Sequence, residues 1–565
     1  MRPAPVLSST LDVLADLAEI RGAAAEAMDL RNAAAAVGGM GPAAAAALQQ
    51  RAQRNSLKDE PGISARLHWT MREVTLGGAE PVLAAARRSI PGLLRRLLEL
   101  PVVNSHEAAA LVRELGLLTL SDLQAALDDG RVARAADRSL EARLRPAAAV
   151  LDLEYRVVPL GRATDLLDGV LAALRISSPS IDLLTPAGDV RRFEALASSL
   201  IVVGRAADPA RAMESLESMT GVDGVLHRSG RRAILQMQQH EVDVRVAAPD
   251  DYGTVLFEAT GSRRHIRAVH ERRGRTRLAP SEEALYAHAG LLFIPPELRE
   301  GSGEVEAAAA GTLPVLVQRE HIRGDLHMHT TYSDGTDSLD VMVAQCAALG
   351  YEYIAITDHS ERAGAARTLT RADLERQRRD IAALRGQYPR MTILHGLEVD
   401  IMPDGRLDFD DAVLEPLDIV LASLHDAARH DANILTERCI KAIRHPLVTV
   451  ITHPANRLVG RRAGYPLDYD AVFAAAAETG TALEVDGAPS HLDLDAELAR
   501  RAVAAGVTLT IDSDCHRARA LHRQMAFGIG TARRGWVEPR HVLNARPLPE
   551  VLAFIARKRR SAWRG

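Results

Sequence analysis

Cysteine is scarce in this chain of 565 residues, and long apolar runs are missing. Its three cysteines, Cys346, Cys439 and Cys515, are too few for a disulfide framework, so we expect a reducing compartment and no disulfide-linked partner. We find no apolar run of about 18 residues and no signal-peptide core in the first residues, MRPAPVLSSTLDVLADL. The sequence therefore predicts no membrane partner and a cytoplasmic location.

Lysine is also scarce and the chain has no net positive charge, which limits Schiff-base chemistry and the binding of nucleic acid. Only three of the 69 basic residues are lysines, and Lys58 is the only one before residue 441. A Schiff-base lyase needs a lysine amine, and Lys58 lies in the polar linker NSLKDEPG, so we do not expect this activity. With a net charge of −5, nucleic-acid binding must come from local patches. The hydrophobic content of 47% allows large cores, and the length predicts at least two domains.

Histidine, by contrast, is concentrated in the C-terminal part, where 13 of the 20 histidines follow residue 316. The segment RGDLHMHTTYSDGT (323–336) places His327 and His329 one residue apart. Alternate residues of a strand leave the same face, so the two imidazoles can bind one metal ion. Such a pair alone is as consistent with a chance surface pair, and the downstream sequence decides between the two interpretations.

Five apolar runs downstream end in metal-binding residue types. Sequence of helical character follows these runs, as in ADLERQRRDIAALRGQY and DYDAVFAAAAETG, which predicts parallel βα units. In a βα barrel the functional side chains gather at the C-terminal ends of the strands, so we predict a multinuclear metal site there. The runs are 353–360, 391–401, 418–426, 447–457 and 507–518, and they close on Asp358 and His359, Glu398, His425, His453, and Asp514 and His516.

These motifs (HMH, TDH, a lone Glu, two isolated His and DCH) occur in an order that resembles a PHP (polymerase and histidinol phosphatase) domain over residues 318–565. The resemblance implies a distorted (β/α)7 barrel with two or three divalent ions. Zn, Mn and Fe all suit this mixture of imidazole and carboxylate. Asp358 is expected to orient an imidazole. The implied ligand groups are His327, His329, Glu398 and Asp514; Glu398, His425 and His453; and Asp334, His359 and His516.

Closely spaced divalent ions activate water and neutralise phosphoryl oxygens, so the expected reaction is phosphoester hydrolysis. We expect Glu398, His327, His329 and Asp514 to be the catalytic ligands. Arg457 and Arg462 are candidate phosphate clamps, because a guanidinium group matches phosphate oxygens; the alternative is a solvated charged loop.

The N-terminal part has a different organisation. Residues 1–150 read as helices, and Gly39 and Gly41 have the form of a helix-hairpin-helix that can bind a DNA phosphate. On spacing alone an ordinary helix link is the stronger interpretation. A second hairpin near residues 97–118 lacks the glycines. Residues 151–315 alternate strands and helices, and TGSRRH (260–265) and PPELREGSGE (295–304) resemble the palm and thumb of bacterial family X DNA polymerases that carry a C-terminal PHP domain.

The palm departs from that family at its catalytic positions. A nucleotidyl transferase needs three carboxylates to hold two Mg²⁺ ions. Ser199 and Ile201 stand where the family has an Asp-x-Asp pair, and only Asp243 survives. Asp189 replaces a serine and would repel a triphosphate. We predict an inactive polymerase site built from Gly188, Arg191, Arg192, Ser199, Ile201, Asp243, Thr260, Gly261 and Ser262.

The sequence thus predicts a multi-domain enzyme: an all-α DNA-binding region (1–150), an α+β palm and thumb (151–315) and an α/β barrel (318–565). The leading hypothesis is a metal-dependent 3′–5′ exonuclease that processes gapped, nicked or 3′ DNA ends in repair, and we favour a monomer. The alternatives are a small-molecule phosphomonoesterase, a non-catalytic DNA-end-binding protein and a residual gap-filling polymerase.

Overall fold

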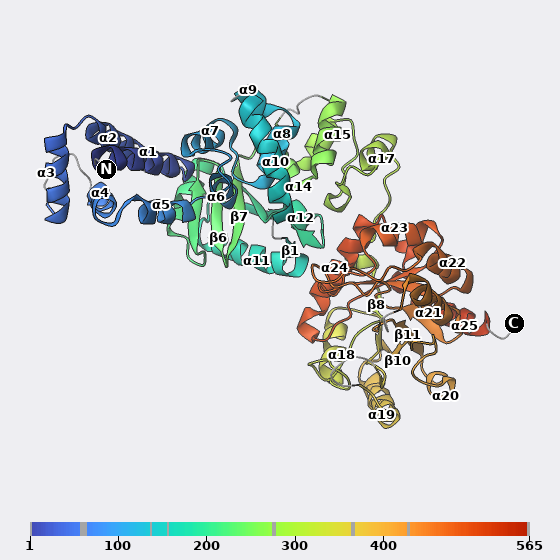
Figure 1. Ribbon diagram of the computed structural model, residues 1–565. Helices are drawn as coiled ribbons and strands as arrows, with labels where there is room; N and C mark the ends of the chain where they lie inside the picture. Colours follow the sequence, from blue (N-terminus) through green and yellow to red (C-terminus); the bar gives the residue numbers. More distant parts are fainter. Residues whose placement is uncertain are drawn as a thin grey trace.

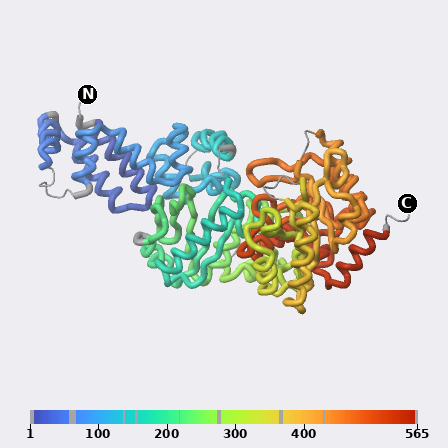
Figure 2. The backbone as a smooth tube through the Cα atoms, turned by 90° about the horizontal axis from the view of Figure 1, so that it is seen from below, coloured from blue at the N-terminus to red at the C-terminus, as the bar shows by residue number. Residues whose placement is uncertain are grey.

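The chain forms three bodies that follow one another along a long axis, with the two termini at opposite ends (Figure 1, Figure 2). The computed structural model describes residues 3–56, 65–135, 138–154, 157–273, 278–362, 368–426 and 430–561. Lys58 lies outside these residues. No helix in the described part is both long and apolar enough to cross a membrane.

The first body is helical, as expected from its high content of alanine, leucine and arginine, which are strong helix formers. Two of its helices begin at a capping box, at Asn104 and at Thr119. The helices are α1 (Pro3–Ile20), α2 (Ala24–Gly38), α3 (Pro42–Gln53), α4 (Ala65–Gly77), α5 (Ala79–Arg88), α6 (Gly92–Glu99), α7 (Ser105–Leu115), α8 (Leu120–Asp128), α9 (Arg131–Ala135) and α10 (Arg138–Glu154).

The second body is built on a five-stranded mixed sheet in the order β2-β4-β7-β6-β5. Strands β2 (Leu183–Ala187), β4 (Ile201–Arg205), β5 (Gly224–Arg228), β6 (Arg232–Met237) and β7 (His240–Ala247) form it, and β1 (Val158–Pro159) pairs with β3 (Leu196–Ala197) beside it. The helices are α11 (Leu160–Ser177), α12 (Gly188–Arg191), α13 (Pro209–Glu214), α14 (Tyr252–Thr260), α15 (Arg263–Arg273), α16 (Glu282–His288) and α17 (Glu304–Ala310).

The third body is a seven-stranded parallel sheet in sequential order from β8 to β14. Its strands are buried on both faces, which explains why they read as continuous apolar runs. They are β8 (Gly324–Asp325), β9 (Tyr353–Ile356), β10 (Thr392–Asp400), β11 (Ile419–Ser423), β12 (Val448–Ile451), β13 (Ala482–Asp486) and β14 (Leu509–Asp512). The helices are α18 (Leu339–Ala348), α19 (Arg371–Gln387), α20 (Asp411–Leu414), α21 (Ala432–Arg444), α22 (Tyr469–Thr479), α23 (Ala496–Ala504), α24 (Leu521–Arg534) and α25 (Leu548–Ser561).

This sheet curls into a nearly closed barrel, because its first and last strands are joined by specific contacts. The backbone N–H of His329 donates to the carbonyl of Cys515 at 3.0 Å. The N–H of Leu326 donates to the Asp512 carboxylate at 2.7 Å, and the N–H of Ser513 donates to Asp325 at 3.1 Å. The three-part fold class expected from the sequence is confirmed.

The barrel is firmly attached to the palm-like second body through α24 (Figure 1). The guanidinium group of Arg523 lies 2.6 Å from Asp165 in α11, and that of Arg534 lies 2.7 Å from Glu300. Gly530 faces the ring of Phe193 so closely that a Cβ atom there would lie 2.1 Å from the ring. Glycine is therefore needed at this point of contact.

Candidate metal centre

The nine predicted metal ligands lie together at the C-terminal end of the barrel strands. Glu398 is part of β10, and the others lie in loops that follow β8, β9, β11, β12 and β14. Two of them, His453 and Asp514, have positive φ angles of 27° and 46°. Such backbone strain in non-glycine residues persists only where the surroundings hold it, and it is concentrated at functional sites.

The first predicted ligand group has the spacing of a metal site. Nε2 of His327 and Nε2 of His329 are 3.1 Å apart. The same two atoms lie 3.4 and 3.6 Å from Oε2 of Glu398, and 3.6 and 3.1 Å from Oδ1 of Asp514. Four ligands at about 2.1 Å from a tetrahedral ion are about 3.4 Å from one another. His327, His329 and Asp514 therefore already have the mutual spacing of ligands to one ion, and Glu398 lies beside the two imidazoles.

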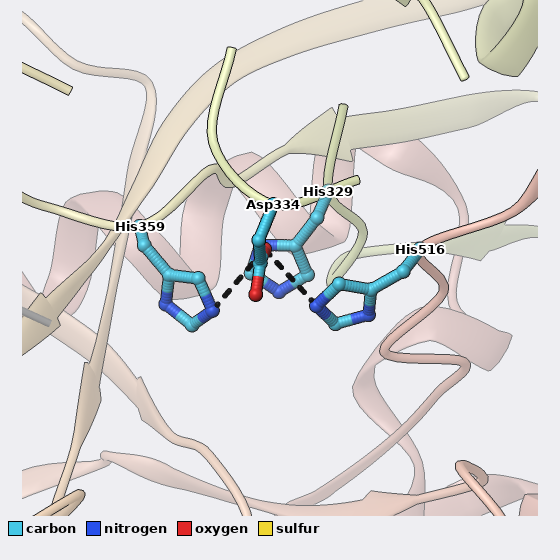
Figure 3. A group of neighbouring side chains, drawn as sticks. All are labelled: His329, Asp334, His359 and His516. Carbon is cyan, nitrogen blue, oxygen red and sulfur yellow. Dashed lines mark ion pairs between the residues drawn. The ribbon is translucent and has the colours of Figure 1, made fainter. Parts of the chain in front are cut away.

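The other two groups adjoin the first. Oε1 of Glu398 lies 3.0 Å from Nε2 of His453 and 3.6 Å from Nε2 of His425, so its two oxygens face different groups. Figure 3 shows His359 and His516 on either side of Asp334, at 3.6 and 3.2 Å from its Oδ1. His359 also lies 2.8 Å from Glu398 through Nδ1. The three groups are therefore continuous.

The charges of this cluster favour ionised carboxylates. Burial by itself raises the pKa of Glu398, but the imidazoles of His359, His327 and His425 hold that pKa well below its usual value. Burial by itself lowers the pKa of His453 and of His516. Glu398 beside His453 and Asp334 beside His516 nevertheless raise the pKa of each imidazole to about 9. In the absence of metal, protons on these imidazoles thus balance the charges of the carboxylates, and a bound metal ion would displace these protons.

Several polar atoms of the cluster are buried without a hydrogen bond, which is the expected state of a site shaped for cations. The clearest case is Oε2 of Glu398, which makes no hydrogen bond of good geometry, although Nδ1 of His359 and Nε2 of His327 lie 2.8 and 3.4 Å from it. Buried polar atoms are rarely left unpaired. Together with the donor set of imidazole and carboxylate, this observation shows that the residues fit divalent ions.

Sequence reasoning missed the residues that hold two of the imidazoles. Glu484 in β13 lies 2.7 Å from Nδ1 of His327 and accepts a 2.7 Å hydrogen bond from the backbone of His453. Asp400 lies 2.5 Å from Nδ1 of His425. Carboxylates in this position fix the tautomer and orientation of a ligating histidine. The short apolar run ALEVD (482–486), which ends like the other strands, was the available signal.

Asp358 has a different role from the expected one. It is buried, but its carboxylate accepts hydrogen bonds from the backbone and hydroxyl of Thr330, at 2.7 and 2.8 Å, from Ser333 and from Gln377 at 2.6 Å. None of its described partners is an imidazole. Asp358 therefore shapes the loop that leads to Asp334 and does not orient a histidine ring.

Arg457 and Arg462 also differ from the expectation of free phosphate clamps. The guanidinium group of Arg457 donates to the carbonyl of His491 at 2.8 Å and to that of Leu492. Arg462 donates to the backbone and side-chain oxygens of Asn456, both at 2.7 Å. Both groups are engaged by the protein itself: Arg457 joins the loop after β12 to the loop after β13, and Arg462 binds within the loop after β12.

A fourth cluster lies next to the first group. Ligand atoms of Asp486, His491 and Asp514 lie within 4.8 Å of one another, and the ring of His491 stacks on that of His453. Burial and the neighbouring His453 lower the pKa of His491 to about 4. The sequence analysis did not include Asp486 or His491.

In the palm, the register of the sheet places Ile201 directly beside Asp243. Ile201 packs into an apolar cluster with Val203 and Tyr252. The Asp243 carboxylate accepts hydrogen bonds from Arg232 and Arg245, at 2.8 to 3.0 Å. Burial by itself raises the pKa of Asp243, but these two arginines lower it to about 2. Its lone pairs are occupied by guanidinium groups and are not available to Mg²⁺.

The other residues of the predicted inactive polymerase site lie together in the palm but bind one another. Arg191 pairs with Glu282 at 2.7 Å and donates to the hydroxyl of Thr260. Arg192 donates to the carbonyl of Thr260 and pairs with Asp189 at 2.7 Å. Asp189 also accepts hydrogen bonds from the backbone N–H groups of residues 198 and 199. The Asp189 carboxylate thus accepts the hydrogen bonds that these N–H groups and Arg192 could otherwise donate to a bound anion. Gly188, Gly261 and Ser262 complete this region.

The two predicted hairpins differ at their helix starts. Gly39 and Gly41 lie in the exposed link between α2 and α3, with ordinary φ angles of −81° and −70°. In the second hairpin, the side chains of Asn104 and Glu107 bind the backbone N–H groups at the start of α7. These groups are therefore already used, and DNA binding by Gly39 and Gly41 stays a prediction.

A known protein matches nearly the whole chain. The DNA polymerase/3′-5′ exonuclease PolX of Bacillus subtilis is 34% identical over 540 residues, which cover 91% of this chain and 94% of that protein. This chain belongs to the PolX family. A family model described as PHP domain matches residues 325–448. The predicted family of polymerase X proteins with a C-terminal PHP domain is thereby confirmed.

The phosphatase relatives of this PolX chain cover its PHP part alone. Probable phosphatases of Thermoanaerobacter sp. and Syntrophotalea carbinolica are 32% and 27% identical, over 34% and 41% of this chain and 78% and 95% of their own lengths. A crystal structure of histidinol phosphate phosphatase from Lactococcus lactis with zinc, L-histidinol and phosphate covers 38% of this chain and 94% of that chain, with 18% identity and a TM-score of 0.31.

Proposed function

We propose that this protein is a metal-dependent phosphodiesterase that removes nucleotides from DNA 3′ ends at gaps or nicks. The observation that carries the proposal is the cluster of buried imidazole and carboxylate side chains at the mouth of the barrel, in which several groups of three or four could each hold an ion and Glu398 joins His453 to the rest. The name of the Bacillus subtilis relative, which includes a 3′-5′ exonuclease, supports the choice of DNA as the substrate. We also keep the expected cytoplasmic location as part of the proposal.

Two or three divalent ions, of Zn, Mn or Fe, would be held by these residues and would supply an activated water and charge neutralisation at the phosphate. The protein residues provide the rest. Glu398 presents one oxygen to each of two groups, and His327 and His329 are fixed in their orientation by Glu484 and by the closing contact to Cys515. This preorganisation means that the groups need not rearrange during the reaction.

The polymerase site is inactive in this proposal. Of the three carboxylate positions, one carries Ser199 and one carries Ile201, and the remaining Asp243 is bound by two arginines. A metal ion at Asp243 would have to displace charge-assisted hydrogen bonds, which are among the strongest in proteins. The helical body and the palm would then serve to bind DNA and not to extend it.

Primer length separates this proposal from its alternatives. The purified protein is incubated with Mn²⁺ and 5′-labelled gapped DNA, with and without nucleotides, and in parallel with a small phosphomonoester. We expect stepwise shortening of the primer in both DNA reactions, loss of shortening with chelator, and little phosphomonoester turnover. Extension would reveal a working polymerase, turnover of the phosphomonoester alone would favour a small-molecule phosphatase, and unchanged DNA that is nevertheless bound would favour a binding protein.

A further inference from the structure

Two loops of the barrel lie between the metal centre and the palm. The loop after β12 begins with His453, and the loop after β13 follows Asp486. At their far sides, Val459 and Leu492 belong to the same buried apolar cluster as Val158 and Leu160 of the palm-like body. The exposed fraction of Leu492 is 0%, so its side chain is completely enclosed. Residues of the hydrolase part thus complete the core of the polymerase-like part.

The two loops are also fastened to each other. The buried carboxylate of Asp493 accepts hydrogen bonds from the backbone N–H groups of Ala455 and Arg457, at 3.2 and 3.4 Å. The N–H of Val459 donates to the carbonyl of Ser490 at 2.8 Å. The Arg457 guanidinium group donates to the opposite loop as described above. A displacement of one loop would therefore move the other.

Both loops hold backbone conformations that side-chain residues rarely adopt. The φ angles of His453, Asn456 and Leu492 are 27°, 45° and 47°. Left-handed conformations of this kind are unfavourable for residues other than glycine and need tertiary contacts to persist. At Leu492 the contacts are those of the palm cluster, and at Asn456 they include the hydrogen bonds from Arg462.

We propose that the palm-like body positions the metal ligands of the barrel, with Leu492 and Val459 as its points of contact and Arg457 as the tie between the loops. This inference rests on the proposed function, because it concerns the same metal centre. It gives the inactive palm a role: its fold is retained because packing on it keeps His453 beside Glu398. Arg457 is accordingly a positioning residue and not a phosphate clamp.

A glycine pair in α11 allows a clean test in the full chain. A Cβ atom at Gly161 would lie 2.8 Å from Cβ of Pro489, in the second loop. A Cβ atom at Gly169, in the same helix, would also meet an atom at 2.8 Å, but that atom is the flexible end of Met237 inside the palm. Gly161→Ala and Gly161→Leu should therefore displace the loop after β13, which contains Pro489. Gly169→Ala and Gly169→Leu are the matched controls.

The measurement is Mn²⁺ affinity, followed by titration of metal-free protein, with hydrolysis of bis(p-nitrophenyl) phosphate and thermal unfolding in parallel. We expect Gly161→Leu to weaken Mn²⁺ binding by about tenfold or more, as loss of outer support does at other metal sites. Turnover should recover at high Mn²⁺, and Gly161→Ala should fall between the wild type and Gly161→Leu. The Gly169 variants should keep the wild-type affinity.

A folded Gly161→Leu protein with wild-type Mn²⁺ affinity would overturn the proposal. If that variant does not fold, Arg457→Met decides. If Arg457 ties the loops together, the variant should bind Mn²⁺ more weakly and keep the wild-type KM at saturating metal. If Arg457 is a phosphate clamp, the variant should bind Mn²⁺ normally and have a raised KM. Failure of the proposed function would look different, because the wild-type protein itself would then bind no metal or hydrolyse no phosphodiester.

Discussion

Replacement of Glu398 by glutamine should abolish hydrolysis while the barrel stays folded. The Glu398 carboxylate faces imidazoles of all three groups, at distances from 2.8 to 3.6 Å, and also accepts a 3.0 Å hydrogen bond from Thr452. Glutamine keeps the size of the side chain but removes its negative charge. A charge about 4 Å from a single opposite unit charge is worth about 4 kcal/mol at an effective dielectric constant of 20.

For divalent ions this loss corresponds to at least about a thousand-fold weaker binding, since each 1.4 kcal/mol is a factor of about ten. The assay is metal content by atomic spectroscopy after gel filtration, with turnover of labelled DNA in the same samples. Gly169→Ala serves as the control for handling, because it lies in the palm. A Glu398→Gln protein that retains full metal content and more than a small fraction of turnover would refute the bridging role.

Three further outcomes follow from the charges of the site and of the palm. Mn²⁺ affinity should fall by about tenfold per pH unit for each proton displaced as the pH decreases from 9 to 6, because the metal-free pKa values of His453 and His516 are about 9 and ligation needs neutral imidazoles; a flat calorimetric titration series across this range would contradict it. Asp243→Asn should lower the free energy of unfolding by about 3 kcal/mol, since it removes the negative charge that pairs with two partly buried arginines, of which Arg232 keeps Asp122 as a second carboxylate partner, yet hydrolysis by the folded protein should be unchanged; chemical denaturation measures the first effect, and an increase in stability would be inconsistent with the ion pairs. The double variant Ser199→Asp, Ile201→Asp should still not extend a primer, because Asp243 remains bound by the arginines; strong extension in a primer assay would mean that these contacts open readily.

The grouping of the candidate ligands could be predicted from the sequence because their signal is local. Each apolar run ends in its own histidine or carboxylate, and the geometry of a parallel barrel brings strand ends together whatever the details of packing. His327 and His329 could be predicted from the two-residue period of extended chain, although strand β8 itself ends at Asp325. The fold of the barrel follows from the same alternation of strands and helices.

The supporting residues could not be predicted in this way, because they depend on contacts between distant segments. Glu484 lies 157 residues from His327, and Arg457 lies 34 residues from His491. Asp358 ends an apolar run like the ligands do, but its environment of hydroxyl and amide donors is set by the loop that folds over it. Of the two arginines that bind Asp243, Arg245 lies two residues further along the same strand, whereas Arg232 becomes a neighbour only through the pairing of β6 with β7.

The most direct test of the account is a titration of metal-free protein with Mn²⁺ while release of the labelled 3′-terminal nucleotide from gapped DNA is followed. The account predicts no release without metal, a rise in rate with added metal, and a plateau after two or three equivalents. Release by the metal-free protein, or no release at saturating metal, would contradict it.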